Sequence, residues 1–200
     1  MIQTNNAALH LSHAVMAHPK DLARLAQIPG ASVDFSPALG VVVPELEGLM
    51  KAPVGEKRYQ SQLNVRAAVE AGAATGLGSD WPSSIIPEPN SFWYLQTWIT
   101  RKLPGRGSTK AHNIKQAISV EQAIEACTLG SAKCMGFDWP SKVGSIETGK
   151  LADFIVLDRN LFEIPVETIA DVLVDRTVVS GKVVFDRFLE EDNLDVVKVR

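Results

Sequence analysis

The stretch Ala73–Pro82 (AATGLGSDWP) constrains this chain more than any other feature of the sequence. It follows a short helical pattern that ends at Gly72, and it is typical of a buried strand that stops at a Ser-Asp pair. A carboxylate at the carboxyl end of a strand lies where α/β enzymes place their chemistry. The alternative is that Ser79 or Asp80 caps a following helix, with Pro82 in its first turn. By spacing alone, the cap is the commoner use of such a pattern.

The composition excludes several classes of protein. A chain of 200 residues fits one domain, or one and a part, and its 46% hydrophobic and 22% charged residues are those of a globular protein. A net charge of −3 gives no reason to expect nucleic acid or an anionic membrane as a partner. No apolar run approaches the roughly 18 residues of a membrane span. The first residues do not resemble a signal peptide, so we expect a cytoplasmic protein.

The two cysteines are expected to pack in the core. Cys127 and Cys134 lie seven residues apart on a predicted helix, which separates them by about 10.5 Å along its axis. That is too far for a disulfide. Packing is therefore favoured over redox or metal chemistry.

Predicted strands and helices alternate along the first half of the chain. This alternation is typical of a parallel sheet with crossover helices. The predicted strands are Ala7–Val15, Ala31–Phe35 and the Ala73–Pro82 stretch, and the predicted helices start at Pro19, span Leu63–Ala71 and span Asn90–Arg101.

Three stretches leave alternatives open. On a strand, His10 and His13 would point to opposite faces and could not share a ligand site, whereas on a helix they would share one face. Residues 38–62 predict a long loop, either a substrate lid or irregular filler. The aromatic side chains of Asn90–Arg101 are expected to pack in the core rather than form a substrate wall.

The glycines of Pro104–Ser108 lack the spacing of a phosphate-binding loop, so nucleotide binding is not expected.

The second half changes in character. Ser119–Gln122 is a capping box that opens a helix running to about Met135. Leu151–Leu157 predicts a strand, and two β-branched runs joined by Ser180–Gly181 predict a tight hairpin. We therefore expect an α/β part over residues 1–138, antiparallel strands over 139–186 and a charged tail over 187–200.

Three motifs in this order resemble the amidohydrolase superfamily, and more narrowly its amidohydrolase-3 group of N-substituted formamide deformylase-like enzymes. Gly78–Pro82 is similar to the end of the group's eighth barrel strand, and His13–Asp21 is similar to its sixth strand and the following helix. Val143–Leu157 resembles the strand by which such chains re-enter a small β-domain beside the barrel. The resemblance covers residues 7–186.

The resemblance implies an α/β fold, namely the C-terminal portion of a metal-dependent hydrolase (β/α)₈ barrel, about strands six to eight, followed by part of a small β-sandwich. It also implies hydrolysis of C–N bonds in small amide-type substrates by water bound to a divalent metal, expected to be zinc. Asp80 stands at the position of the aspartate that passes a proton from this water to the leaving nitrogen and can also bind the metal. His13 stands at the position of a metal ligand or a carbonyl polariser, and Ser12 replaces a common Glu. The chemistry is sound, because a bound metal brings the pKa of water toward neutrality and a carboxylate can carry the proton.

The resemblance is to only part of such an enzyme. A barrel needs eight strands and roughly 250 residues, and the strand-one His-x-His pair, the bridging lysine and the strand-five histidine have no counterpart here. Catalytic zinc takes three protein ligands, so we expect these 200 residues not to retain metal by themselves. A split or truncated gene, or an incomplete gene prediction, is the expected origin of the chain.

Two other hypotheses remain. The chain could be a non-catalytic remnant or subunit that pairs with a separate N-terminal half or with itself, because open strand edges need covering. It could also be a small α/β binding domain without metal, which the Val143–Leu157 motif disfavours.

Overall fold

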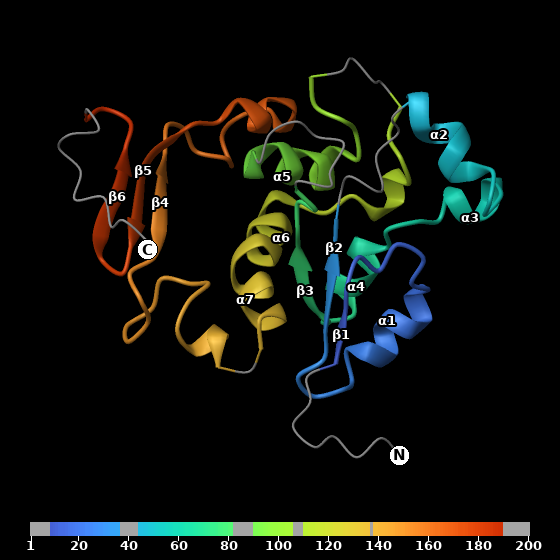
Figure 1. Cartoon of the computed structure of the whole chain (residues 1–200), viewed down its shortest axis with the longest axis horizontal. Helices are drawn as coiled ribbons and strands as arrows, with labels where there is room; N and C mark the ends of the chain where they lie inside the picture. Colours follow the sequence, from blue (N-terminus) through green and yellow to red (C-terminus); the bar gives the residue numbers. More distant parts are fainter. Residues whose placement is uncertain (1–8, 37–43, 82–89, 106–109, 137, 190–200) are drawn as a thin grey trace.

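Three parallel strands form the centre of the molecule (Figure 1). The computed structural model describes residues 9–36, 44–81, 90–105, 110–136 and 138–189. Strands β1 (His10–Leu11), β2 (Ser32–Phe35) and β3 (Ala74–Leu77) lie side by side in the order of the sequence. Both pairs are parallel, as the alternation of strands and helices predicts.

The helices before and after β3 begin at residues that satisfy free backbone groups. Helix α1 (Pro19–Leu25) starts after His18, whose Nδ1 accepts a hydrogen bond from Lys20 N at 3.1 Å. Helix α5 (Ser91–Thr100) starts after Asn90, whose side chain accepts from two backbone amides of the first turn. Helix α4 (Val65–Glu70) comes between α1 and α5 in the sequence and directly precedes β3.

The predicted capping box is present. Ser119 Oγ accepts from Gln122 N at 3.2 Å, and Gln122 Oε1 accepts from Ser119 N at 3.0 Å. This box opens one helical run, which consists of α6 (Val120–Glu125), the π-helical turn η3 (Ala126–Gly130) and α7 (Ser131–Cys134). The run ends at the predicted position, next to Met135.

One face of the parallel sheet packs on α1, α4 and α5. Alternation along β2 puts Val33 and Phe35 on this face, and both are fully buried. They belong to one hydrophobic cluster with Leu22 of α1, Ala68 of α4 and Trp98 of α5. The rings of Phe35 and Trp98 meet edge to face, with 6.1 Å between their centroids.

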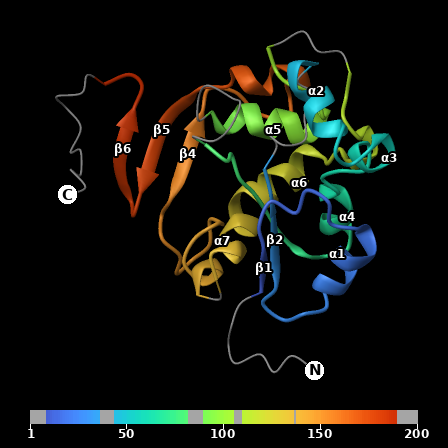
Figure 2. The same cartoon turned by 45° about the vertical axis from the view of Figure 1, so that its right-hand side comes forward.

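The helical run α6–α7 lies against the other side of β3. Gly76 pairs in register with Asp34, so these two residues point away from the face that carries Val33. A Cβ atom on Gly76 would lie 2.8 Å from Cys134 Sγ, and one on Gly130 would lie 2.0 Å from the carbonyl oxygen of Thr75. The two glycines therefore allow the helix to touch the strand. Figures 1 and 2 show the result: β3 lies between α6–α7 on one side and α1 and α4 on the other.

Both cysteines are free and half-buried. Cys127 packs against the hydrophobic cluster, as predicted, and Cys134 contacts the backbone of Val33 on β2. Burial raises the pKa of the Cys127 thiol to about 12, and burial also raises the pKa of the Cys134 thiol. Thiols in this state are protonated at neutral pH and are poor nucleophiles and metal ligands.

Two predictions about the first half are wrong. The strand predicted over Ala7–Val15 is short in its described part, because the chain turns after Leu11 and reaches positive φ angles of 62° at His13 and 31° at Ala14. The loop predicted over residues 38–62 contains two helices, α2 (Pro44–Lys51) and α3 (Glu56–Tyr59). Pro44 stands at the first position of α2. A backbone N–H at this position has no acceptor within the helix, so the N–H that proline lacks costs nothing here.

A second sheet is antiparallel and is formed by β4 (Phe154–Leu157), β5 (Val174–Val179) and β6 (Lys182–Asp186). Ser180 and Gly181 join β5 to β6 with φ angles of 50° and 76°, which fits the predicted tight hairpin. The short 3₁₀ helix η5 (Val166–Asp171) precedes β5 and packs on α5.

The two sheets share one hydrophobic cluster. Leu161, Ile169 and Val172 lie on the segment between β4 and β5 and belong to the same buried cluster as Val33 and Phe35. Ala170 N donates to Gln96 Oε1 of α5 at 2.7 Å and fixes this contact. Two further 3₁₀ helices, η2 (Ile114–Gln116) and η4 (Trp139–Ser141), are short. None of the described helices is long and apolar enough to cross a membrane.

Candidate functional site

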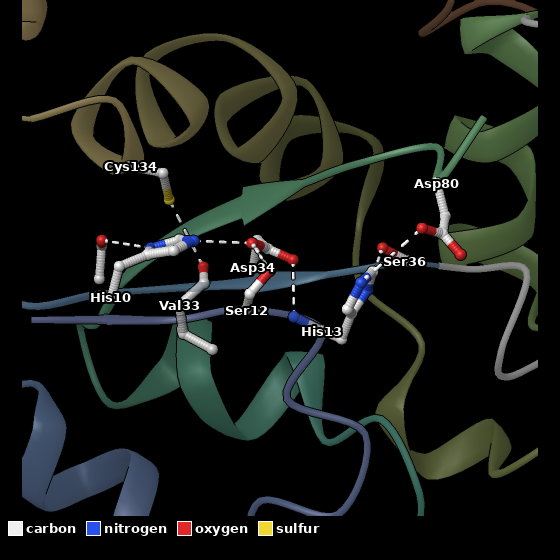
Figure 3. Close-up of polar contacts among 9 residues, drawn as sticks. His10, Ser12, His13, Val33, Asp34, Ser36, Asp80 and Cys134 are labelled. Carbon is white, nitrogen blue, oxygen red and sulfur yellow. Dashed lines mark hydrogen bonds and ion pairs between the residues drawn. The ribbon is translucent and has the colours of Figure 1, made fainter. Parts of the chain in front are cut away.

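Polar side chains from all three parallel strands meet at the carboxyl ends of these strands (Figure 3). His13 follows β1, Ser36 follows β2 and Asp80 follows β3. Parallel strands bring the residues that follow them to one edge of the sheet. The two residues singled out by the sequence, His13 and Asp80, thus lie on the same edge.

Asp80 lies in a sharp turn after β3. The ladder between β2 and β3 ends where Gly78 N donates to Phe35 O at 3.0 Å. Asp80 then adopts a positive φ angle of 59°, a conformation that aspartate tolerates better than most residues. The cap-like hydrogen bond here belongs to Ser79, whose Oγ accepts from Trp81 N at 3.1 Å. The helix that the capping alternative would start at Pro82 falls on residues 82–89, outside the described part of the chain.

His13 points its imidazole toward Asp80. Its Nδ1 lies 2.9 Å from Ser36 Oγ, and its Nε2 lies 3.7 Å from Asp80 Oδ1. The second distance is that of an ion pair when His13 is protonated and is too long for a hydrogen bond. Both side chains are partly exposed, so the pair is accessible to solvent and to small molecules.

The carboxylate of Asp34 on β2 accepts hydrogen bonds from three groups of β1 and the turn that follows it. Its Oδ1 accepts from His13 N at 2.9 Å, and its Oδ2 accepts from Ser12 Oγ at 3.0 Å and from His10 Nε2 at 2.7 Å. Because a carboxylate only accepts, His10 carries its proton on Nε2, and its Nδ1 lies 2.8 Å from Ser32 Oγ.

Sequence reasoning missed Asp34 and Ser36, and it weighed His10 only as a possible ligand partner of His13. The spacing of the two missed residues could have found them, because Asp34 and Ser36 lie two residues apart at the end of a predicted strand, hence on one face. Ser12, noted for replacing a Glu, contacts a carboxylate from the neighbouring strand instead.

The two histidines do not form a joint ligand pair. Sequence reasoning separated them by strand alternation, but β1 ends before His13, so alternation is not the cause. Instead, both ring nitrogens of His10 are already engaged, one by Ser32 and one by Asp34. Among the described residues no group of three or more His, Cys, Asp or Glu side chains could hold a metal ion.

His13 and Asp80 suit a divalent metal as two of its ligands. An imidazole Nε2 and a carboxylate oxygen face each other, and the other ring nitrogen of His13 is hydrogen-bonded to Ser36 Oγ, which orients the ring. Zinc commonly takes three protein ligands, so the described residues supply part of such a set.

A cavity of about 820 Å³ lies next to the site. Gly78 and Ser79, directly before Asp80, form one wall, and residues of α5, η3, β4 and β5 form the others. Phe92 and Tyr94 of the aromatic helix line it, while Trp98 is fully buried in the core. The aromatic helix therefore contributes both to packing and to a cavity wall.

Comparisons with known sequences cover nearly the whole chain. The sequence model of the amidohydrolase family matches residues 3–185. The chain is 26% identical over 183 residues to the N-substituted formamide deformylase of Arthrobacter pascens, an alignment that covers 91% of this chain and 32% of the deformylase. It is 34% identical over 95 residues to the 5-methylthioadenosine/S-adenosylhomocysteine deaminase of Bacillus cytotoxicus, which covers 48% of this chain and 20% of the deaminase.

Solved structures share the fold. An adenosine deaminase from Xanthomonas campestris with bound zinc superposes with a TM-score of 0.61 at 19% identity, over 89% of this chain and 37% of the deaminase. The A. niger ochratoxinase superposes with a TM-score of 0.62 at 17% identity, over 90% of this chain and 38% of the ochratoxinase. The chain thus spans about a third of the length of the deformylase and somewhat more of these two structures. By its match over residues 3–185, the chain belongs to the amidohydrolase family.

Proposed function

We propose that the chain carries part of the active site of a hydrolase that cleaves C–N bonds in small amide-type substrates. The observation that carries this proposal is the approach of His13 Nε2 to Asp80 Oδ1, 3.7 Å apart, at the carboxyl ends of neighbouring parallel strands. Membership of the amidohydrolase family and the deformylase and deaminase relatives support it.

In this proposal His13 and Asp80 hold a divalent metal, zinc by comparison with the zinc-bound deaminase structure. When bound, such a metal makes a water molecule acidic enough to lose a proton near neutral pH. Asp80 would accept a proton from the water that attacks the substrate carbonyl. It would then pass that proton to the nitrogen of the breaking C–N bond, which regenerates the carboxylate. Ser36 keeps the His13 ring oriented through its 2.9 Å hydrogen bond.

The larger architecture is part of the same proposal. The parallel strands and their helices would correspond to about strands six to eight of a (β/α)₈ barrel, over residues 1–138. The antiparallel strands of residues 139–186 would belong to a small β-sandwich, with a charged tail over 187–200. The cavity beside Asp80 would receive the apolar part of a substrate.

Pairing with another half of the enzyme, or with a second copy, completes the proposal. The antiparallel sheet exposes large apolar side chains, among them Ile155 at 49%, Phe185 at 43% and Val156 at 41%. Surfaces of this kind are commonly covered by another protein segment.

The test measures amide hydrolysis by the chain alone and by the chain co-expressed with the remaining two thirds of the N-substituted formamide deformylase. With zinc supplied, the assembled protein should release amine from a formamide, and Asp80→Asn should remove most of this activity. The exposed Asp138 gives a matched control, because Asp138→Asn makes the same chemical change away from the site. Equal activity of the Asp80 and Asp138 variants would contradict the assignment of Asp80.

A further inference from the structure

The turn that carries His13 is held by few backbone contacts. Among the described residues the β1–β2 ladder has two registered pairs, His10 with Ser32 and Leu11 with Val33. Beyond it, His13 and Ala14 both adopt positive φ angles, 62° and 31°. Residues other than glycine rarely adopt such φ angles, and each residue that does so destabilises the fold by on the order of 1 kcal/mol. Contacts outside the ladder must therefore hold this turn.

Backbone hydrogen bonds lie in or beside the turn, among them those from Ala14 N to Ser12 O and from Leu63 N to Val15 O. Asp34 binds the His13 amide itself. We propose that Asp34 is a positioning residue: its carboxylate fixes the left-handed turn at His13 and so directs the imidazole of His13 toward Asp80. The hydrogen bond from His13 N to Asp34 Oδ1, 2.9 Å long, takes the place of the next rung of the ladder. Hydrogen bonds from Ser12 Oγ and His10 Nε2 to Oδ2 hold the carboxylate itself.

β2 thus positions His13 at two points. Asp34 binds its backbone, and Ser36, two residues further on the same face, binds its ring at Nδ1. With the backbone and one ring nitrogen fixed, only Nε2 remains to face Asp80 (Figure 3). Neither Asp34 nor Ser36 belongs to the hydrophobic cluster, which β2 contacts through Val33 and Phe35. A change at Asp34 should therefore loosen the His13 turn without opening the core.

This inference rests on the proposed function, since it concerns the orientation of the same His13–Asp80 pair. It can nevertheless be tested without metal or substrate. Amide hydrogen exchange followed by NMR on the whole chain reports the His13 amide directly, and side-chain ¹⁵N spectra report which nitrogen of each imidazole carries the proton. The Gly78 amide, bonded to Phe35 O across β2 and β3, reports the integrity of the sheet.

Asp34→Ala should lower the protection of the His13 amide by about 10- to 100-fold, as expected for loss of a hydrogen bond to a charged group. The Gly78 amide should keep its protection. Asp34→Asn should retain most of the His13 protection, because its amide oxygen still accepts from His13 N, while its NH₂ group should move the proton of His10 from Nε2 to Nδ1. Ser36→Ala should free the His13 ring and leave the His13 amide protected. Asp21→Ala is the control, since Asp21 pairs only with Arg24 on the exposed face of α1.

Unchanged protection of the His13 amide in Asp34→Ala would overturn the positioning role alone. An equal loss at His13 and Gly78 would also overturn it, because Asp34 would then be needed for the sheet as a whole. If the His13 amide loosens in Asp34→Ala while the co-expressed enzyme keeps full turnover, the positioning role stands and the part of His13 in the proposed function is wrong.

Discussion

Arg101 and His112 hold each other through two hydrogen bonds: His112 N donates to Arg101 O at 2.8 Å, and Arg101 Nε donates to His112 O at 2.9 Å. Both side chains are buried, and the ring of Tyr59 packs on the imidazole with 4.7 Å between the centroids. Burial, followed by the charge of Arg101, lowers the pKa of His112 to about 4. With its pKa lowered to about 4 the imidazole is neutral at pH 7, and neither ring nitrogen has a hydrogen-bond partner in the described structure.

This histidine makes stability depend on pH. Its pKa is near 6.5 when unfolded and about 4 when folded, so the unfolded chain binds the proton first as the pH falls. The stabilising contribution is present above pH 6.5 and is lost progressively toward pH 4, by about 3 kcal/mol in total. Denaturant unfolding of wild type and His112→Leu between pH 4 and 8 measures how the free energy of unfolding depends on pH in each. Between pH 6.5 and 4 it should fall more steeply in wild type than in the variant. Parallel curves would show that His112 is protonated equally well in both states.

Contact between Gly76 and Cys134 gives a second prediction. Because a Cβ on Gly76 would lie 2.8 Å from Cys134 Sγ, Gly76→Ala should lower the free energy of unfolding by about 1–3 kcal/mol. Cys134→Ala removes the sulfur, so the double variant should recover part of that loss. A double-mutant cycle measured by denaturant unfolding gives the coupling. Purely additive effects would place α7 away from β3.

The isolated chain should bind zinc weakly or not at all, because His13 and Asp80 supply only two ligands. Titration calorimetry followed by dialysis and elemental analysis measures this. His13→Ala should remove whatever binding the wild type shows, and His18→Ala, which changes an exposed histidine at the start of α1, should not. Tight stoichiometric zinc that survives a chelator would mean that the set of ligands is complete in this chain.

The exposed apolar side chains of the antiparallel sheet predict self-association and binding of a hydrophobic dye. Light scattering should show species larger than a monomer. Replacing Ile155 and Phe185, both more than 40% exposed, by threonine should reduce dye binding while preserving strand propensity. A monomer that melts cooperatively and binds no dye would contradict this prediction.

Local sequence signals predicted the elements that depend on neighbouring residues. The Ser119 capping box and the Ser180–Gly181 hairpin depend on backbone groups three or fewer residues away, and both are present. Helices α2 and α3 were missed because Pro44, Pro53 and Gly55 are also typical of loops, and tertiary contacts decide between the two.

Some residues of the candidate site were likewise predictable from local sequence, and others were not. Asp80 was found because it ends a recognisable strand, and His13 because it lies in a family motif. Asp34 acts on residues 21 to 24 positions earlier in the chain, a relationship set by the register of β1 on β2. A single sequence does not give that register, so the carboxylate that holds His13 becomes visible only in the fold.

The last prediction separates the backbone of Asp80 from its carboxylate. Because Asp80 has a φ angle of 59°, glycine and asparagine should fit its turn, whereas alanine should be strained by about 1 kcal/mol. Asp80→Asn and Asp80→Gly should therefore change the free energy of unfolding by less than about 1 kcal/mol, and Asp80→Ala should lower it more. In the co-expressed enzyme, however, all three variants should lose turnover by about 10²- to 10⁴-fold or more, because none can accept a proton. A helix cap predicts the opposite for asparagine, which caps as well as aspartate: full turnover with unchanged stability. Measuring rate and stability on the same three variants thus decides between an acid–base group and a cap.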